Sequence, residues 1–149
     1  MIERLATLTV LLVDDDDVAA ESVQRSLHKA GLMVPVVWAE DGESALRALR
    51  GEDPARVVPR PRVTLLDLNM PRMNGFEFLE ALRADRDLCD DVVFVLTTSD
   101  ADTDRMRAYQ GHIAGYMVKS ALGPQFARLA QLLAVYHQAM RLPGKHSGR

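Results

Sequence analysis

The amino-acid sequence predicts an α/β domain, a doubly wound five-stranded parallel sheet with helices on both faces. Five short segments are rich in Val and Leu and are too apolar for strands that face water on one side. Segments with helical spacing of apolar residues lie between them. Because this alternation calls for right-handed crossovers, it favours the strand order 2-1-3-4-5.

The expected elements follow one another along the chain. Each strand segment is bounded by turn residues and is too short for a typical helix, whereas the segments between them are long enough for two turns or more. The expected strands are residues 8–13, 34–39, 63–66, 92–96 and 115–118. The expected helices are residues 18–30, 42–50, 76–84, 102–110 and 122–140.

Local signals mark where these elements begin and end. Asp16 or Asp17 is expected to cap the first helix, and Thr98 and Ser99 the fourth, because short polar side chains accept hydrogen bonds from the free N–H groups of a first turn. Three prolines make residues 51–61 an irregular loop before the third strand.

Length and composition indicate one globular domain. The chain has 149 residues, 48% of them apolar, which suits a single core. We expect that domain to occupy residues 1–149, with its core at 8–140, a frayed tail at 141–149 and no output domain. No apolar run approaches the roughly 18 residues that span a bilayer, and the start lacks a signal-peptide layout. A cytoplasmic protein without membrane contact is therefore expected.

Charge and cysteine content disfavour several functions. Residues 119–149 hold five basic side chains and no acidic one, but these charges are scattered and lack interleaved aromatic residues, so no DNA binding is expected. Cys89 is the only cysteine, which leaves no disulfide and no thiol cluster for a metal. Neither GxGxxG nor GxxxxGK occurs, so nucleotide binding has no motif to support it.

Acidic side chains stand at the ends of two expected strands. Asp14 and Asp15 follow the first strand, and Asp67 follows the third. Because the carboxyl ends of parallel strands share one edge of a sheet, these carboxylates are expected to meet there. Neighbouring carboxylates repel one another unless a cation joins them, and Mg²⁺ prefers oxygen ligands. The residues predict a Mg²⁺ site, with a solvated acidic turn as the alternative for Asp14 and Asp15.

The residues after the third, fourth and fifth strands point to phosphoryl chemistry. Pro71 and a left-handed Gly75 predict a loop that holds the Asp67 carboxylate open to solvent. An exposed aspartate beside a cation and a lysine can attack phosphorus and form an acyl phosphate. Lys119 ends the fifth strand, and the Thr97 hydroxyl ends the fourth, where it can donate to a phosphoryl oxygen.

Four motifs in the right order give the chain a family resemblance: LLVDDDD, LLDLNMPRMNGFEFL, FVLTTSD and GYMVKS. Over residues 8–140 the chain resembles the receiver domain of bacterial two-component response regulators. The resemblance implies a flavodoxin-like fold and a histidine kinase as phosphoryl donor. It also implies a protein that promotes only its own phosphorylation and dephosphorylation and is not otherwise an enzyme.

The resemblance assigns the acidic site residue by residue. Asp67 matches the phosphoacceptor. Asp14 and Asp15 match the residues that hold Mg²⁺ together with Asp67 and the carbonyl of Asn69. A Mg²⁺-dependent phosphohydrolase is a rival reading, but Asn69 stands where that class would need an aspartate as its catalytic acid.

The resemblance also assigns a conformational switch. Thr97 and Lys119 match the residues that grip the phosphoryl group. In the family the Thr97 hydroxyl moves toward that group and the Tyr116 ring turns inward behind it. The altered surface would consist of the fourth helix, the fifth strand and the last helix.

The apolar residues of the last helix predict that another protein surface covers it. Phe126, Leu129, Ala130, Leu133 and Met140 form its expected core stripe. Apolar side chains also lie off that stripe: Leu132, Val135, Ala139 and Leu142. A helix that is apolar on more than one face usually has a second surface covering it, so we expect a homodimer through the output surface. The amino-acid sequences of the motifs are similar to those of small regulators that partner bacterial phytochrome kinases.

One residue departs from the family pattern. The family usually has proline after the lysine, in a cis bond, whereas this chain has Ser120. A cis bond before serine costs about 2.5–4 kcal/mol. Either the bond stays cis, or it relaxes to trans and redirects the loop, moving Lys119. The second case keeps open an interaction module that has the receiver fold and works without phosphorylation.

Overall fold

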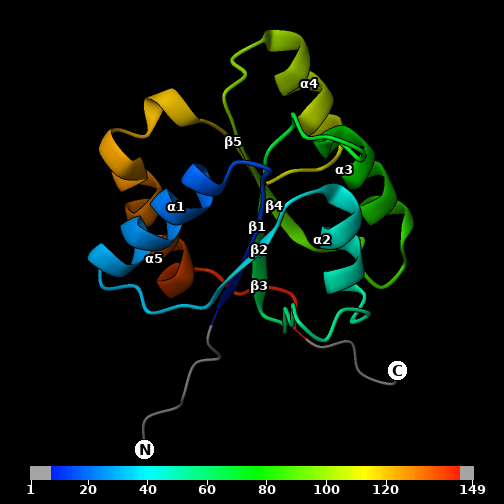
Figure 1. Ribbon diagram of the computed structural model, residues 1–149, viewed down its shortest axis with the longest axis horizontal. Helices are drawn as coiled ribbons and strands as arrows, with labels where there is room; N and C mark the ends of the chain where they lie inside the picture. The colour runs from blue at the N-terminus through cyan, green and yellow to red at the C-terminus, as the bar shows by residue number, and fades with distance from the viewer. Residues whose placement is uncertain (1–7, 145–149) are drawn as a thin grey trace, which may run out of the picture.

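The protein, described over residues 8–144 in a computed structural model, is built around one parallel sheet in the order β2-β1-β3-β4-β5 (Figure 1). This is the predicted α/β fold and the predicted strand order. The strands are β1 Thr9–Val13, β2 Val36–Ala39, β3 Arg62–Leu66, β4 Val92–Thr97 and β5 Gly115–Val118. All four strand pairings are parallel, so every strand ends at the same edge of the sheet.

Helices cover both faces of the sheet, as predicted for a doubly wound domain (Figure 1). They are α1 Asp17–Lys29, α2 Gly42–Leu49, α3 Gly75–Ala84, α4 Asp102–Gln110 and α5 Ala127–Ala139. Helices α1 and α5 pack on one face, with Val23, Leu129 and Leu133 in the core, while α2, α3 and α4 pack on the other, with Leu46 and Phe78. Within residues 8–144, no helix is long and apolar enough to cross a membrane.

The end of the chain differs most from the prediction. A continuous helix was expected over residues 122–140, but two short 3-10 turns precede α5, at Lys119–Ala121 and Pro124–Phe126. Gly123 has a φ of 78° and Pro124 begins the second turn, and a left-handed residue followed by proline interrupts a helix. The chain enters regular α5 only at Ala127.

The predicted core stripe of the last helix is correct in its centre and wrong at its end. Leu129, Ala130 and Leu133 are buried, and Phe126 packs partly against the same core. Met140 is 51% exposed because α5 has already ended and Met140 is its extended C-cap. Leu132, Val135 and Ala139 are exposed, as expected for side chains off the stripe, but Leu142, also expected off the stripe, packs against the core.

Residues 141–144 do not form the expected frayed tail. Leu142 packs against the core on the α1 and α5 side, and the Gly144 carbonyl accepts a hydrogen bond from Arg60 Nη1 at 3.4 Å. The remaining residues of the predicted tail, 145–149, lie outside the described residues. The described part of the segment is thus attached to the edge where the strands begin.

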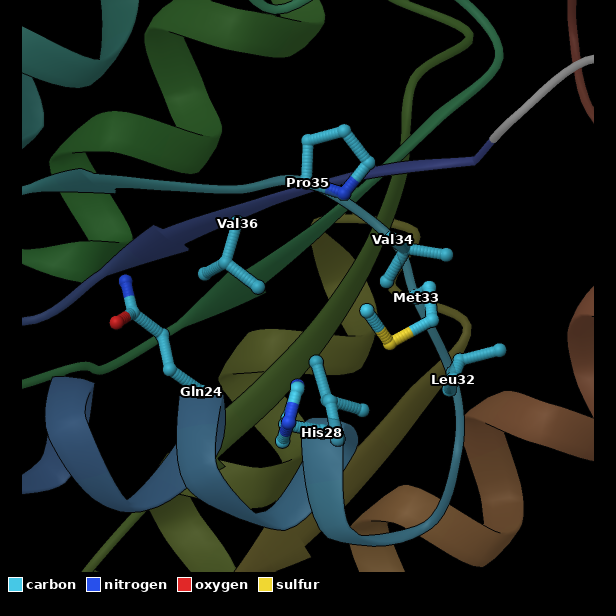
Figure 2. Close-up of a pocket in the computed structure, with 8 residues that line it drawn as sticks. Gln24, His28, Leu32, Met33, Val34, Pro35 and Val36 are labelled. Carbon is cyan, nitrogen blue, oxygen red and sulfur yellow. The ribbon is translucent and has the colours of Figure 1, made fainter.

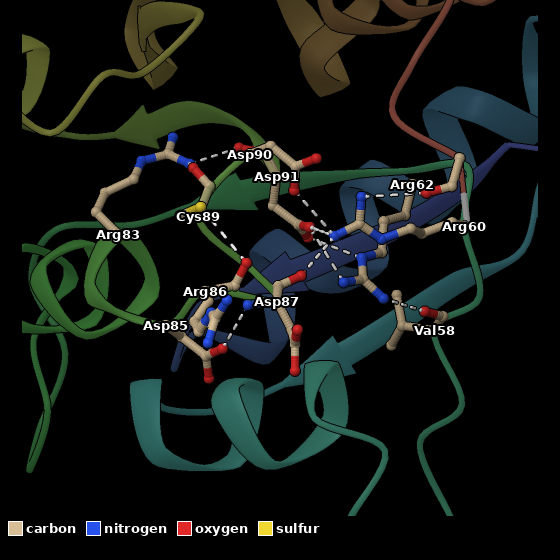
Figure 3. A network of polar contacts seen from close by, with 11 residues as sticks. Val58, Arg60, Arg62, Arg83, Asp85, Arg86, Asp87, Cys89, Asp90 and Asp91 are labelled. Atoms are coloured by element: carbon tan, nitrogen blue, oxygen red, sulfur yellow. Dashed lines mark hydrogen bonds and ion pairs between the residues drawn. The ribbon is translucent and has the colours of Figure 1, made fainter. Parts of the chain in front are cut away.

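A buried ionic network joins the beginnings of β3 and β4 (Figure 3). Arg62 donates to both carboxylate oxygens of Asp91, from Nε at 2.7 Å and from Nη2 at 3.1 Å. Arg60 Nη2 donates to the same carboxylate at 2.7 Å. The Asp91 side chain is 1% exposed, and those of Arg60 and Arg62 are 8% and 9% exposed. Asp91 is therefore the buried carboxylate that both guanidinium groups share, and Arg60 also pairs with the more exposed Asp90.

We predict that Asp91→Asn lowers the free energy of unfolding by about 3–5 kcal/mol, because it removes the buried negative charge that Arg60 and Arg62 share and leaves the buried Arg62 without its carboxylate partner. Urea denaturation of the variant and the parent measures the difference. Asp90→Asn is the matched control: the Asp90 side chain, which also pairs with Arg60, is 44% exposed, so its loss is expected to cost within about 1 kcal/mol. Equal losses in the two variants would contradict the assigned role of the network.

Candidate functional site

The strand register brings the predicted site residues to one edge of the sheet. Val13 pairs with Leu66, so Asp14 and Asp67 leave neighbouring strands at the same level. Leu66 pairs with Val95 in turn, which places Thr97 at the next strand end. Thr97 itself pairs with Val118, the residue before Lys119. The site is therefore a direct product of strand order and register.

Three carboxylates form a compact group at this edge. Asp14, Asp15 and Asp67 each offer one oxygen, and these oxygens lie within 4.8 Å of one another. Asp14 is fully buried, Asp67 is 6% exposed and Asp15 is exposed. A set of oxygen ligands with one open side matches what Mg²⁺ accepts, because this ion takes one or two carboxylates and keeps several waters. The residues thus fit a divalent cation.

Asp67 is more enclosed than the sequence led us to expect. The carboxylate was predicted to be open to solvent, but the residue keeps only 6% of its accessible surface. The loop after it folds back, since Gly75 N donates to the Leu68 carbonyl at 3.0 Å. Leu68 is 1% exposed, and its burial draws the start of the loop into the protein.

Gly75 is required for a reason other than the predicted one. A left-handed turn was expected there, but Gly75 is the first residue of α3, and the left-handed residue of this loop is Arg72, with a φ of 64°. A Cβ on Gly75 would meet the Asp67 carbonyl oxygen at 2.5 Å and Leu68 Cα at 2.7 Å. Glycine is needed because the backbones of α3 and the Asp67 loop approach so closely.

Lys119 reaches the acidic group from β5. Its Nζ donates to Asp14 Oδ2 at 2.7 Å, and the lysine side chain is 12% exposed. Asp16 N donates to the other oxygen, Asp14 Oδ1, at 2.9 Å. Burial raises the pKa of Asp14, while the hydrogen bonds from Lys119 and Asp16 oppose that rise. One ammonium group faces three carboxylates, which leaves a place for further positive charge.

Ser120 does not displace the lysine. The only cis peptide bond within residues 8–144 is Arg60–Pro61, so the Lys119–Ser120 bond is trans. The loop after β5 turns at once into the 3-10 segment Lys119–Ala121. Of the two outcomes considered for this bond, relaxation to trans is observed, and Lys119 still contacts Asp14.

Sequence reasoning missed two residues that support the acidic loops. Trp38 Nε1, on β2, donates to the backbone carbonyl of Asp14 at 2.7 Å. Asp41 is 2% exposed, caps α2 by accepting from Ser44 N at 2.8 Å and pairs with Arg72. Burial acts to raise the pKa of Asp41, but the hydrogen bonds from Ser44 and Arg72 outweigh it and hold the pKa below its usual value. The Trp38 contact and the Asp41–Arg72 pair join distant segments and have no local signal, whereas the Asp41 cap could have been predicted from an aspartate directly before the second helix.

The predicted switch residues lie on β4 and β5. Thr97 is fully buried. Tyr116 is half-buried and packs partly against the core under α3 and α4, and its hydroxyl donates to the Ser99 carbonyl at 3.0 Å. Burial raises the pKa of Tyr116. Asn69 is exposed, two residues after Asp67.

The predicted caps agree with the structure at α1 and not at α4. Asp16 caps α1 by accepting from Val18 N at 2.9 Å. Helix α4 was expected to be capped by Thr98 and Ser99, but its N-cap is Ala101, which supplies no side-chain acceptor. Ser99 lies too far before the helix to be the N-cap, and its hydroxyl donates to Asp104 instead.

A groove elsewhere on the surface is separate from this site (Figure 2). It lies between the second half of α1 and the segment that enters β2, and its lining includes Gln24, His28, Met33 and Val36. None of the predicted site residues lines it. The chemistry of the strand ends is therefore carried by a shallow acidic edge and not by this groove.

Comparison with known proteins gives consistent results. The family model described as the response regulator receiver domain matches residues 10–131. The chain is 37% identical over 111 residues to a probable methanogenesis regulatory protein, FilR2, of Methanothrix harundinacea, covering 74% of this chain and 70% of that one. It is 33% identical over 111 residues to the response regulator Rcp1 of Synechocystis, covering 74% of this chain and 76% of that one.

Solved structures agree with the sequence comparison. The crystal structure of the phosphorylated cyanobacterial phytochrome response regulator RcpA has a TM-score of 0.82 and 30% identity, and the match covers 93% of this chain and all of that one. The manganese-bound form of Rcp1 has a TM-score of 0.79 and 29% identity, covering 91% of this chain and 99% of that one.

We predict that Mg²⁺ binding changes the emission of Trp38, the only tryptophan, because its indole is bonded to the backbone of Asp14. A fluorescence titration is expected to saturate. Asp15→Asn is expected to weaken binding by more than the roughly tenfold loss that removal of an outer-shell partner causes. Asp17→Asn, in the same acidic run, is the control and should bind as the parent does. An unchanged midpoint in Asp15→Asn would refute the assigned metal site.

Proposed function

The chain belongs to the response regulator receiver family, and we propose that it accepts a phosphoryl group from a histidine kinase on Asp67 in a Mg²⁺-dependent reaction. The observation that carries the proposal is the convergence of three carboxylates, within 4.8 Å of one another, with Lys119 paired to the buried Asp14. A receiver is a signalling module, so the product of the proposed reaction is the receiver itself with a phosphoryl group on Asp67.

The residues proposed to hold the metal are Asp14, Asp15, Asp67 and the carbonyl of Asn69. The acidic group and its single lysine fit a divalent cation, and Rcp1, a relative, has been crystallised with manganese. When bound, Mg²⁺ supplies positive charge that offsets the charge of the transferring phosphoryl group.

The remaining steps belong to side chains of this chain. An oxygen of the Asp67 carboxylate attacks phosphorus, the bond from phosphorus to the histidine nitrogen of the kinase breaks, and an acyl phosphate forms on Asp67. The Lys119 ammonium group and the Thr97 hydroxyl are proposed to donate hydrogen bonds to the phosphoryl oxygens. The Lys119 ammonium group already donates a hydrogen bond to Asp14. After phosphorylation it would also donate a hydrogen bond to a phosphoryl oxygen on Asp67.

The proposed donor is the histidine kinase domain of a bacterial phytochrome. The support is similarity to RcpA, which is named as a phytochrome response regulator. The proposed location of this chain is the cytoplasm. The Tyr116 ring and the Thr97 hydroxyl are the proposed switch, through which the modified Asp67 alters the surface of α4, β5 and α5.

That surface is also the proposed homodimer interface. Val135 is 64% exposed and Leu132 is 39% exposed on the outer face of α5, while Met106 and Tyr109 are 66% and 48% exposed on α4. Arg128 is the only Asp, Glu, Lys or Arg side chain of helix α5, so two copies of the helix can approach with little like-charge repulsion. The proposed partner of the face is a second copy of the chain.

We predict that Asp67 takes up a phosphoryl group when the protein is incubated with Mg²⁺ and acetyl phosphate. Intact mass spectrometry is expected to show the gain in the parent, none in Asp67→Asn, and an unchanged gain in Asp100→Asn, which removes an exposed carboxylate elsewhere. Transfer from a phosphorylated histidine kinase then tests the donor. If the parent gains no mass although it binds Mg²⁺, the chain is instead an interaction module that works without phosphorylation.

We predict that Val135→Glu raises the dimer dissociation constant at least about tenfold, since a charge would be buried without a partner at the interface. Sedimentation equilibrium of the parent and the variant gives both constants. Met33→Glu is the control, because Met33 is an exposed apolar side chain, 71% accessible, outside the proposed interface. A parent that stays monomeric at high concentration would refute the interface.

A further inference from the structure

Ser99 forms hydrogen bonds with residues of three different secondary-structure elements. Its backbone N donates to Thr97 Oγ1 at 3.4 Å, and its backbone carbonyl accepts from the Tyr116 hydroxyl at 3.0 Å. Its own hydroxyl donates to Asp104 Oδ2 at 2.7 Å and accepts from Ala101 N at 3.3 Å. One residue of the loop between β4 and α4 thus touches the strand end, β5 and the first turn of α4.

Helix α4 has few other attachments to the protein. Ala108 is its only buried residue, and its N-cap supplies no side-chain hydrogen bond. Elements with little buried apolar surface open locally more easily than the core does. The hydrogen bond from the Ser99 hydroxyl to the Asp104 carboxylate is charge-assisted, which makes it stronger than a bond between neutral groups. It is therefore a principal restraint on the beginning of α4.

We propose that Ser99 is the positioning residue that couples the phosphoryl site to α4, with its hydroxyl holding the loop to Asp104 and its backbone joined to Thr97 and Tyr116. The coupling rests on the proposed function of Asp67. The attachment to Asp104 exists in the unmodified protein and does not depend on that function.

The lengths of the hydrogen bonds made by Ser99 indicate how the phosphoryl site is coupled to α4. The contact from Ser99 N to Thr97 Oγ1 is long at 3.4 Å, and hydrogen bonds of this length are weak. When the Thr97 hydroxyl turns to a phosphoryl oxygen on Asp67, this contact is the one that is lost. The short bond to Asp104 persists, so the movement of the loop is passed to α4, and the Ser99 carbonyl passes it to Tyr116. Such a chain of contacts is a physical route between the two sites.

Hydrogen exchange of the unmodified protein tests the attachment. Ser99→Ala is expected to raise the exchange rate of amides 105–107, the first of α4 that donate to backbone carbonyls, about tenfold, because local opening becomes easier. Ser99→Thr keeps the hydroxyl and is expected to restore the parent rate, and Thr98→Ala, at the exposed neighbouring position, is the control. Asp104→Ala is expected to match Ser99→Ala, and the double variant should exchange no faster than either single variant.

Two results would overturn the attachment. Exchange in Ser99→Ala at the parent rate would show that the hydroxyl restrains nothing. Failure of Ser99→Thr to restore protection, or additive effects in the double variant, would show that the two side chains do not act through one bond.

Exchange after treatment with Mg²⁺ and acetyl phosphate tests the coupling. The expected result is that Ser99→Ala gains the phosphoryl group as the parent does, but that the exchange of α4 changes only in the parent and in Ser99→Thr. An equal change of α4 exchange in phosphorylated Ser99→Ala would refute the coupling. A parent that gains no phosphoryl group would refute the proposed function of Asp67 and the coupling that rests on it, while the exchange of the unmodified variants would still decide the attachment.

Discussion

The burial of Asp14 beside Asp67 is the constraint on which the rest of the site depends. Both carboxylates end neighbouring strands at the same level, and neither has more than 6% of its surface in water. Charges removed from water need partners of opposite sign. Lys119 provides one, and the open side at Asp15 leaves room for a cation. The arrangement of lysine, backbone donors and loops follows from the need to hold this charge.

The sequence was sufficient for features that depend on chain topology. Parallel strands deliver their last residues to one edge, so the meeting of Asp14, Asp67, Thr97 and Lys119 could be predicted once the strands were located. It was not sufficient for features that depend on distant contacts. The support from Trp38 joins segments far apart in sequence. The burial of Asp67 and the close backbone approach at Gly75 depend on how a single loop folds back on itself, which residue types alone did not determine.

The ends of the helices were also difficult to predict from the sequence. Apolar spacing predicted the centre of α5 correctly, but Met140 is exposed because the helix ends one residue earlier. Leu142 looked like part of a frayed end, yet it packs against the core. Ser99 was predicted to cap α4, and its hydroxyl bonds to Asp104 instead. Each outcome depends on where the chain turns, which spacing alone does not determine.

The two edges of the sheet are stabilised differently. Where the strands begin, Asp91 binds two buried arginines and the end of the chain is attached through Leu142 and Gly144. Where the strands end, the acidic group is open to solvent at Asp15 only, and α4 has one buried residue. The proposed phosphorylation would change the charge of the second edge, and the lightly packed α4 beside it is the element that would respond.

The location of a bound paramagnetic metal shows whether the strand ends form one metal site. Mn²⁺ added below stoichiometry to ¹⁵N-labelled protein broadens the amide resonances of nearby residues. Broadening is expected to centre on Asp14, Asp15 and Asp67, with little effect at Arg62 and Asp91 on the opposite edge. Broadening centred on another acidic segment, such as residues 85–91, would contradict the claim that the strand ends form one metal site.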